Sequence, residues 1–253
     1  MKFRHWLIFV VIVSFANNVF AETAPGNMQL FLLIGQSNMA GRGAVEPSDK
    51  ATDPRIFMLT KEQQWVPAKD PVHFDKPVAG VGLCSEFARQ MVAANPKIKV
   101  GLIPCAVGGT SLDQWKAGGS LYNNAIARAR EAMKHGTLAG ILWHQGESDC
   151  ESGKVATYGE RFAAMIGQLR KDLQAENVPV IMGELGQFKP SGKAFNAALP
   201  EVIRRVPLCA LATSEDLTDK GDKTHFDSPS LRIFGKRYAE AFLKLKAQAP
   251  AKK

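Results

Sequence analysis

Five short apolar runs recur along the chain and predict the strands of a buried sheet. Each run is apolar at consecutive positions, whereas a strand with one solvent-exposed face would alternate apolar and polar residues. Consecutive apolar residues are typical of parallel strands that are covered on both faces. The runs span residues 29–34, 100–104, 138–144, 179–185 and 208–213.

Stretches with apolar residues at helical spacing lie between and after these runs. They predict five helices, over residues 83–94, 121–135, 155–175, 194–206 and 230–247. A chain that alternates strands with helices favours an α/β fold around a parallel sheet. Because no repeat, low-complexity tract or linker interrupts the alternation, we expect one domain.

Residues 41–82 depart from this alternation. The stretch is rich in proline and shows little periodicity, which predicts a long loop after the first strand. Long loops in compact domains are usually functional or disordered, and the large side chains of Trp65, His73 and Phe74 argue against disorder. We therefore interpret the segment as an ordered wall of an active site.

The amino terminus has the pattern of a secretory signal peptide. A basic start is followed by a short apolar core and by a small residue, Ala21, at the expected cleavage position. An uncleaved membrane anchor is the alternative, but the apolar core is short for a span and Asn17 and Asn18 interrupt it. We expect removal of residues 1–21, which leaves an exported domain of residues 22–253 that is secreted or periplasmic.

The charge of the chain is moderately basic and evenly spread. Of its 32 basic and 24 acidic residues, Lys2 and Arg4 belong to the expected signal peptide, so the mature chain has a net charge of +6. The basic residues form no run of five or six, which argues against a nucleic-acid-binding surface. A weak attraction to acidic polysaccharide is compatible with this surface.

The state of the four cysteines stays open. An exported chain can oxidise Cys84, Cys105, Cys150 and Cys209, and four cysteines allow three full pairings that the sequence does not distinguish. Two of them lie in apolar strand-like runs, so buried free thiols are the alternative. No close Cys-x-x-Cys pair occurs, which argues against a zinc or redox site.

Polar and glycine-containing segments follow four of the predicted strands and hold a candidate catalytic set. Ligands of open α/β sheets bind beyond the carboxyl ends of the strands, so these segments should meet at one rim. Ser37 follows the first strand, and a serine nucleophile requires a base and a group that orients the base. His225 has a carboxylate three residues earlier, Asp222, in a loop that follows the last predicted strand, so one loop can present both groups.

An ester hydrolase also needs hydrogen-bond donors aimed at the developing oxyanion. The candidates are the backbone N–H of Ser37, the N–H of Gly108 or Gly109 and the side-chain amide of Gln145. No complete cluster of metal ligands is apparent, so we expect no metal.

Together these segments resemble the SGNH, or GDSL-like, hydrolase superfamily. The matching pieces are FLLIGQSNMAG at 31–41, GVG at 80–82, PCAVGGT at 104–110, WHQGESD at 143–149 and HFD at 225–227. The resemblance is strongest to the carbohydrate acetylesterase branch, which includes sialate O-acetylesterases and carbohydrate esterase family six. The pieces occur in the family's order and span almost the whole of the expected mature chain.

The resemblance implies a fold, an activity and a site. The fold would be a three-layer α/β/α flavodoxin-like one, with five parallel strands in the order 2-1-3-4-5. The activity would be removal of acetyl groups from carbohydrate hydroxyls without a cofactor. Ser37 would be the nucleophile, His225 the base and Asp222 the orienting acid. The oxyanion hole would consist of Ser37, Gly108 and Gln145.

Three positions set this chain apart from related patterns. Gln145 stands where the superfamily commonly has asparagine, but glutamine keeps the amide donor. Glu147 lies on the same rim and is a rival for the orienting acid, although the loop spacing favours Asp222. Met39 replaces the final glycine of a Gly-x-Ser-x-Gly motif, which argues against an α/β-hydrolase nucleophile elbow.

Two other functions and the identity of the sugar remain open. A lipid esterase or thioesterase on the same fold would have a wide apolar groove near Ser37, and a carbohydrate-binding protein would have lost catalysis. Acetylated xylan, sialic acid, peptidoglycan and pectin are all compatible with the sequence. Aromatic rings and imidazoles can shape a sugar site but more often serve packing; the candidates are Trp65, His73, Trp115 and Tyr122.

Overall fold

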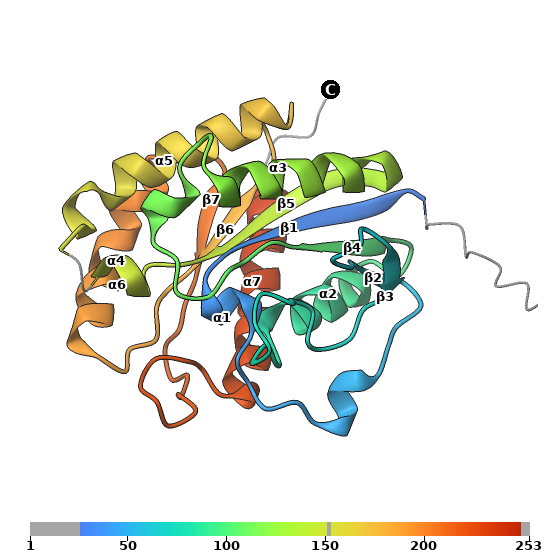
Figure 1. The fold of residues 1–253 in the computed structure, drawn as a ribbon, viewed down its shortest axis with the longest axis horizontal. Coiled ribbons are helices and arrows are strands. Elements are labelled where there is room, and N and C mark those ends of the chain that lie inside the picture. Colours follow the sequence, from blue (N-terminus) through green and yellow to red (C-terminus); the bar gives the residue numbers. More distant parts are fainter. Residues whose placement is uncertain (1–25, 151–152, 249–253) are drawn as a thin grey trace, which may run out of the picture.

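A seven-stranded β-sheet lies between two layers of helices in the computed structural model, which describes residues 26–150 and 153–248 (Figure 1). The spatial order of the strands is β3-β2-β4-β1-β5-β6-β7, and all neighbours are parallel except β2 and β3. The strands are β1 (Met28–Gly35), β2 (Ile56–Leu59), β3 (Trp65–Pro67), β4 (Lys99–Pro104), β5 (Gly136–His144), β6 (Val180–Gly183) and β7 (Cys209–Ala212).

The α/β class is confirmed, but the expected sheet of five strands in the order 2-1-3-4-5 is wrong. The two additional strands, β2 and β3, come from residues 41–82, for which the sequence predicts a loop. They are four and three residues long and thus too short to show a period in the sequence. Strand β2 forms by pairing with β4, as in Ile56 with Val100, so a tertiary contact decides its conformation.

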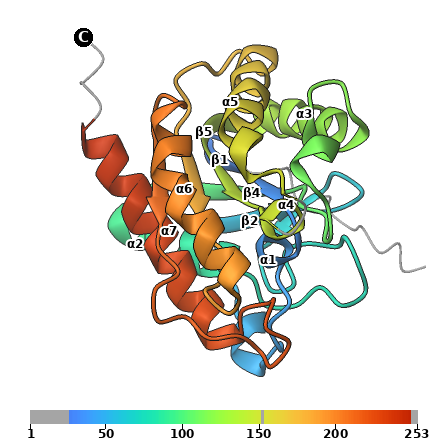
Figure 2. The ribbon, with the colours of Figure 1, turned by 90° about the vertical axis from the view of Figure 1, so that its left-hand side faces the viewer.

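Helices cover both faces of the sheet. Figure 2 shows α3 and α5 on one side, with α2 and α7 on the other. The long helices are α2 (Leu83–Ala94), α3 (Ser120–Ala132), α5 (Val155–Asp172), α6 (Pro190–Arg204) and α7 (Ser228–Gln248), and they correspond to the five predicted helices. Single-turn helices α1 (Ser37–Ala40) and α4 (Glu147–Cys150) follow β1 and β5. Short 3-10 helices span Pro47–Lys50, Leu112–Trp115 and Met133–His135.

The central strand β1 is buried on both faces, as its consecutive apolar residues predict. Leu30, Leu32 and Ile34 pack with α3, α5 and α6, while Phe31 and Leu33 pack with α2 and α7. Burial of each of these side chains stabilises the fold by about 2 kcal/mol. The carboxyl end of β1, where Ser37 begins α1, is therefore held by a central strand that is buried on both faces.

Three of the four cysteines are free thiols. Cys84 and Cys105 are buried and Cys209 is half-buried, so none of the three full pairings is formed. Burial raises the pKa of Cys105 and that of Cys209 to about 12, which keeps both protonated and unreactive.

The predicted signal peptide, residues 1–21, lies outside the described residues. In residues 26–150 and 153–248, no helix combines the length and the apolar character that crossing a bilayer requires.

Asp70 is a buried carboxyl group in the segment that leads from β3 to α2. Its Oδ1 accepts a hydrogen bond of 3.4 Å from the Gly82 N–H. Burial, with a smaller contribution from Asp49, raises the pKa of Asp70 to about 6. In an unfolded chain this pKa is about 3.9, so the native state binds more protons between pH 4 and pH 6. Ionised Asp70 therefore destabilises the fold at neutral pH.

We expect Asp70→Asn to flatten the dependence of stability on pH. The unfolding free energy of the natural chain should rise by about 1 kcal/mol more than that of the variant when the pH falls from 7 to 5. Urea unfolding at both pH values measures this difference. The exposed Asp216→Asn change is the control and should keep the natural slope. Equal slopes for Asp70→Asn and the natural chain would contradict the prediction.

Candidate active site

Ser37 stands at a sharp turn where β1 passes into α1. Gly35 has a φ of +129°, and a Cβ there would lie 2.1 Å from the His144 carbonyl oxygen, so only glycine fits. The Gln36 N–H donates to that carbonyl at 2.8 Å, which ties the turn to the end of β5. The N–H of Ser37 makes no hydrogen bond to any residue that the structure describes. It is thus available as an oxyanion donor.

The loop after β7 brings His225 and Asp222 to Ser37, as the sequence predicts. His225 Nε2 lies 2.9 Å from Ser37 Oγ, and His225 Nδ1 lies 2.7 Å from Asp222 Oδ2. The other Asp222 oxygen accepts the backbone N–H groups of Thr224 and His225 at 2.9 and 2.8 Å. The three groups thus form one chain from carboxylate to hydroxyl.

Asp222 is held in its ionised form by its surroundings. Partial burial alone would raise its pKa, but hydrogen bonds from the His225 backbone and ring and from the Thr224 backbone outweigh burial and lower the pKa to about 2. A carboxylate at Nδ1 places the ring proton on that nitrogen. His225 Nε2 is then free to accept the proton of Ser37.

Glu147, the rival candidate for the acid that orients His225, contacts residues other than His225. Its Oε1 accepts a hydrogen bond of 2.7 Å from Asn38 Nδ2 and lies 3.5 Å from His144 Nε2. Within the described residues it makes no hydrogen bond to His225. Of the two acids considered, the structure therefore brings Asp222, and not Glu147, to the His225 ring.

The structure contradicts the expectation that the Gln145 amide faces the site. Gln145 is fully buried; its Nε2 donates to Thr110 O and to Asp149 Oδ2, and its Oε1 accepts from Tyr158. A third acceptor, Gln36 Oε1, lies 3.1 Å from Nε2. These bonds connect the segments that follow β1, β4 and β5, so the buried Gln145 side chain holds the three segments together.

Gly108 lies beside Ser37, but its N–H already has an acceptor. It donates at 2.8 Å to Asp75 Oδ2, and the same oxygen lies 2.6 Å from Arg42 Nη2. A Cβ on Gly108 would come within 2.4 Å of Arg42 Nη2 and 3.3 Å of Ser37 Cβ, so a larger residue would not fit. Burial alone would raise the pKa of Asp75, but Arg42 and the Gly108 N–H outweigh it and hold the pKa below its usual value.

The ion pair of Arg42 and Asp75 is a feature that the sequence reading missed. Both side chains are buried and both come from residues 41–82, the segment that we expected to form a wall of the site. No motif marks them, because neither stands at a spacing typical of a catalytic group. The region was predicted, but its contributing residues were not.

A cavity of about 600 Å³ opens over Ser37 and His225. Its lining includes Gly108, Gly109 and Glu147, and three lysines, Lys76, Lys189 and Lys220. None of the four ring-bearing residues expected to shape a sugar site lines it. His73, Trp115 and Tyr122 are buried, and Trp65 lies in the edge strand β3.

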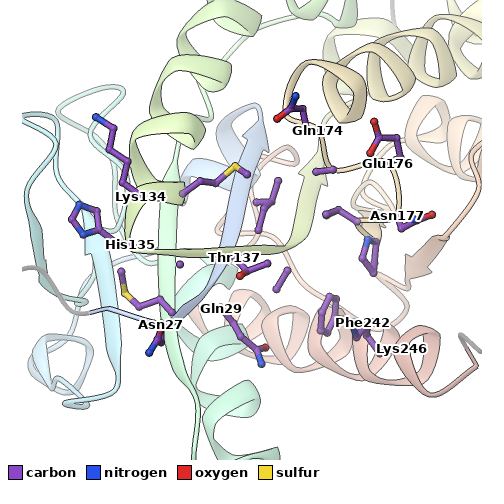
Figure 3. A pocket seen from close by; sticks show the side chains of 18 of the residues that line it. Asn27, Gln29, Lys134, His135, Thr137, Gln174, Glu176, Asn177, Phe242 and Lys246 are labelled. Atoms are coloured by element: carbon purple, nitrogen blue, oxygen red, sulfur yellow. The ribbon is translucent and has the colours of Figure 1, made fainter. Parts of the chain in front are cut away.

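A larger cavity of about 940 Å³ lies at the opposite end of the strands, beside the residues where β1 and β5 begin (Figure 3). Exposed polar side chains such as Asn27, Thr137 and Asn177 line it. It contains none of the candidate catalytic groups. The candidate catalytic groups Ser37, Asp222 and His225 lie instead in the smaller cavity, at the carboxyl ends of the strands, where open α/β sheets bind ligands. No group of three metal-ligating side chains occurs in residues 26–150 and 153–248.

Sequence comparison links the chain to carbohydrate esterases. The profile of a family described as "Carbohydrate esterase, sialic acid-specific acetylesterase" matches residues 27–244. A probable carbohydrate esterase of Arabidopsis thaliana is 30% identical over 238 residues, which are 85% of this chain and 90% of the relative. The X-ray structure of this Arabidopsis protein has a TM-score of 0.80 at 29% identity and covers 87% of this chain and 99% of its own.

More distant structures share the fold. The crystal structure of NanS has a TM-score of 0.75 at 18% identity, over 89% of this chain and 99% of that one. A carbohydrate acetylesterase from Xanthomonas citri has a TM-score of 0.67 at 19% identity, over 87% of this chain and 57% of that one. At such identities the likeness concerns the fold alone.

Substitution of Asp222 tests which acid orients His225. We expect Asp222→Asn to lower kcat for 4-nitrophenyl acetate about a thousandfold or more, because the amide no longer selects the productive tautomer of His225. The Michaelis constant should change little. Asp219→Asn, in the same loop, is the matched control and should keep the natural rate. A residual rate of one tenth or more in Asp222→Asn would show that another group orients the base.

Proposed function

The chain belongs to the carbohydrate esterase family described as sialic acid-specific acetylesterases, and we propose that it removes O-acetyl groups by acyl transfer through Ser37, His225 and Asp222. Its enzyme class is that of carboxylic ester hydrolases, and the resemblance seen in the sequence is confirmed. The observation that carries the mechanism is the hydrogen-bonded chain, 2.9 Å from Ser37 Oγ to His225 Nε2 and 2.7 Å from His225 Nδ1 to Asp222 Oδ2.

The proposed reaction has two steps. His225 Nε2 takes the proton of Ser37 as Oγ attacks the acetyl carbonyl carbon, and His225 then gives this proton to the departing sugar oxygen. Water next attacks the acetyl-serine while His225 Nε2 takes a proton from the water, and His225 then returns this proton to Ser37 Oγ as the acyl–oxygen bond breaks and acetate leaves. Asp222 stays ionised throughout and stabilises the imidazolium form of His225.

The oxyanion of each step needs donors that are in place beforehand. The Ser37 N–H meets this requirement, since no described residue accepts it. The Gly108 N–H is the second proposed donor, and here the substrate oxygen has to displace or share with Asp75. Gln145 supports this arrangement only indirectly, by holding Gln36 and the Thr110 carbonyl.

The cavity favours a polar and anionic substrate over a lipid. Apart from glycines, Val78 is the only apolar residue among the described residues that line it. Lys76, Lys189 and Lys220 give the lining a positive charge, which attracts an acetylated sugar that carries a carboxylate. A sialic acid or an acetylated uronic acid fits this description better than neutral xylan. Export, which the signal-peptide pattern of residues 1–21 predicts, would bring the enzyme to acetylated sugars of polymers and cell surfaces.

Ser37→Ala tests the nucleophile. We expect release of acetate from acetylated sialosides to fall at least a thousandfold, because no other hydroxyl among the described residues that line this cavity has an imidazole base at hydrogen-bond distance. Ser148→Ala, which alters another serine of the same cavity, is the control and should retain activity. Circular dichroism confirms that both variants are folded. Retention of one tenth of the rate in Ser37→Ala would refute the proposed mechanism.

Lys76→Gln tests the preference for anionic sugars. Lys76 forms no ion pair within residues 26–150 and 153–248, so its charge is available to a substrate. We expect the Michaelis constant for an acetylated sialoside to rise about two- to fivefold at low salt, and the effect to shrink at high salt. Neutral acetylated xylosides should be unaffected. Lys97→Gln, on an exposed lysine far from the cavity, is the control; an equal change for both substrates would contradict the prediction.

A further inference from the structure

The catalytic loop needs an anchor that Asp222 does not provide. Asp222 orients the His225 ring, but both residues belong to the same loop after β7, so they move together. The side chain of Asp222 is 38% exposed, and the backbone groups that it binds also lie in the loop. Some contact from another element must therefore set the distance between His225 and Ser37.

Asn38 provides this contact. It is fully buried and directly follows the nucleophile in α1. Its Nδ2 donates to the carbonyl of Thr224 at 3.0 Å, and its Oδ1 accepts the N–H of Phe226 at 3.2 Å. One side-chain amide thus holds the backbone on both sides of His225.

Glu147 determines which way this amide points. Its Oε1 accepts the second N–H of Asn38 Nδ2 at 2.7 Å. A reversed amide would place the Asn38 oxygen against two acceptors, Glu147 and the Thr224 carbonyl, and would leave the Phe226 N–H facing an NH₂ group. Only one orientation satisfies all three partners.

The interior of the protein holds Glu147 in turn. His144, at the end of β5, lies 3.5 Å from Glu147 through Nε2 and contacts the hydroxyl of Tyr238 in α7 through Nδ1. Burial alone would raise the pKa of Glu147, but His144 and Asn38 outweigh it and keep the pKa below its usual value. Glu147 therefore remains an acceptor for Asn38 at neutral pH.

We propose that Asn38 is a positioning residue for the base, which fixes His225 relative to Ser37 by bridging the Thr224 and Phe226 backbones to α1, with Glu147 setting the orientation of its amide. The proposal rests on the proposed function of Ser37 and His225. It gives Glu147 a role that acts through Asn38 instead of through the His225 ring.

Packing of Phe226 makes the proposal testable in a folded protein. The Phe226 ring is fully buried and packs edge-on against Phe188 and Phe234, with ring centroids 5.1 Å away in both cases. These contacts hold the loop on the core without Asn38. Loss of Asn38 should therefore shift His225 without unfolding the loop, and a shift of about 1 Å can cost a hundredfold in rate.

The first experiment compares Asn38→Ala and the isosteric Asn38→Asp with Asn123→Ala, which removes an exposed asparagine from α3. We expect both Asn38 variants to lower kcat for 4-nitrophenyl acetate about ten- to a hundredfold with little change in KM, and the control to keep the natural rate. In Asn38→Asp the new carboxylate faces Glu147 and the Thr224 carbonyl. Adding Glu147→Gln to Asn38→Asp supplies a donor to that carboxylate and should recover part of the loss.

The second experiment separates positioning from a general structural role. In a cycle with His225→Ala, Asn38→Ala should lower the residual rate less than threefold, because a residue that acts through His225 has no effect once His225 is absent. A further loss equal to that in the natural background would overturn the proposal, as would natural kcat in both Asn38 variants. If instead Ser37→Ala and His225→Ala keep the natural rate, the proposed function itself fails.

Discussion

Burial of β1 between β4 and β5 is the constraint on which the site depends. The register pairs Gly35 with His144 on one side and Leu33 with Pro104 on the other. The three strands therefore end at nearly the same level, and the turns that follow them lie side by side at the rim formed by their carboxyl ends. Hydrogen bonds then cross from turn to turn, from Gln36 N–H to the His144 carbonyl and from Val107 N–H to the Gly35 carbonyl. The turn that carries Ser37 is therefore hydrogen-bonded to both neighbouring strands, independently of the contact between Ser37 and His225.

Two carboxylates of the rim are kept ionised for different purposes. Asp222 is partly exposed and its ionised form is stabilised by hydrogen bonds within its own loop, which suits the proposed mechanism, in which a positive charge develops on His225. Glu147 is enclosed beside His144 and Asn38, and no charge needs to develop next to it. Both acids follow a predicted strand at the same rim, so the sequence leaves both as candidates to orient His225. Their hydrogen-bond partners distinguish them, because Asp222 contacts the His225 ring and Glu147 contacts Asn38.

The features that could be predicted from the sequence are those with a local cause. Consecutive apolar residues indicate β1 because a strand buried on both faces needs an apolar side chain at every position. Asp222 and His225 are recognisable because they stand three positions apart in one loop. Strands β2 and β3 are different, since they are ordered by pairing with an existing edge of the sheet. The predicted role of the Gln145 amide as an oxyanion donor fails for a similar reason. Gln145 is buried against Tyr158 of α5, and no local sequence pattern indicates that contact.

The ion pair of Arg42 and Asp75 bears on the proposed role of the Gly108 N–H as an oxyanion donor. A buried carboxylate without a partner would be strongly disfavoured, so Arg42 is what allows Asp75 to lie 2.8 Å from this donor. Asp75 Oδ2, an anionic oxygen, already accepts the hydrogen bond that an oxyanion would accept from the Gly108 N–H. The backbone at Gly108 is therefore already oriented to donate to an anionic oxygen. The Ser37 N–H has no such competitor in the described chain. The two proposed donors are therefore unequal: the Ser37 N–H has no acceptor among the described residues, whereas the Gly108 N–H already has Asp75, which an oxyanion would have to displace or with which it would have to share this N–H.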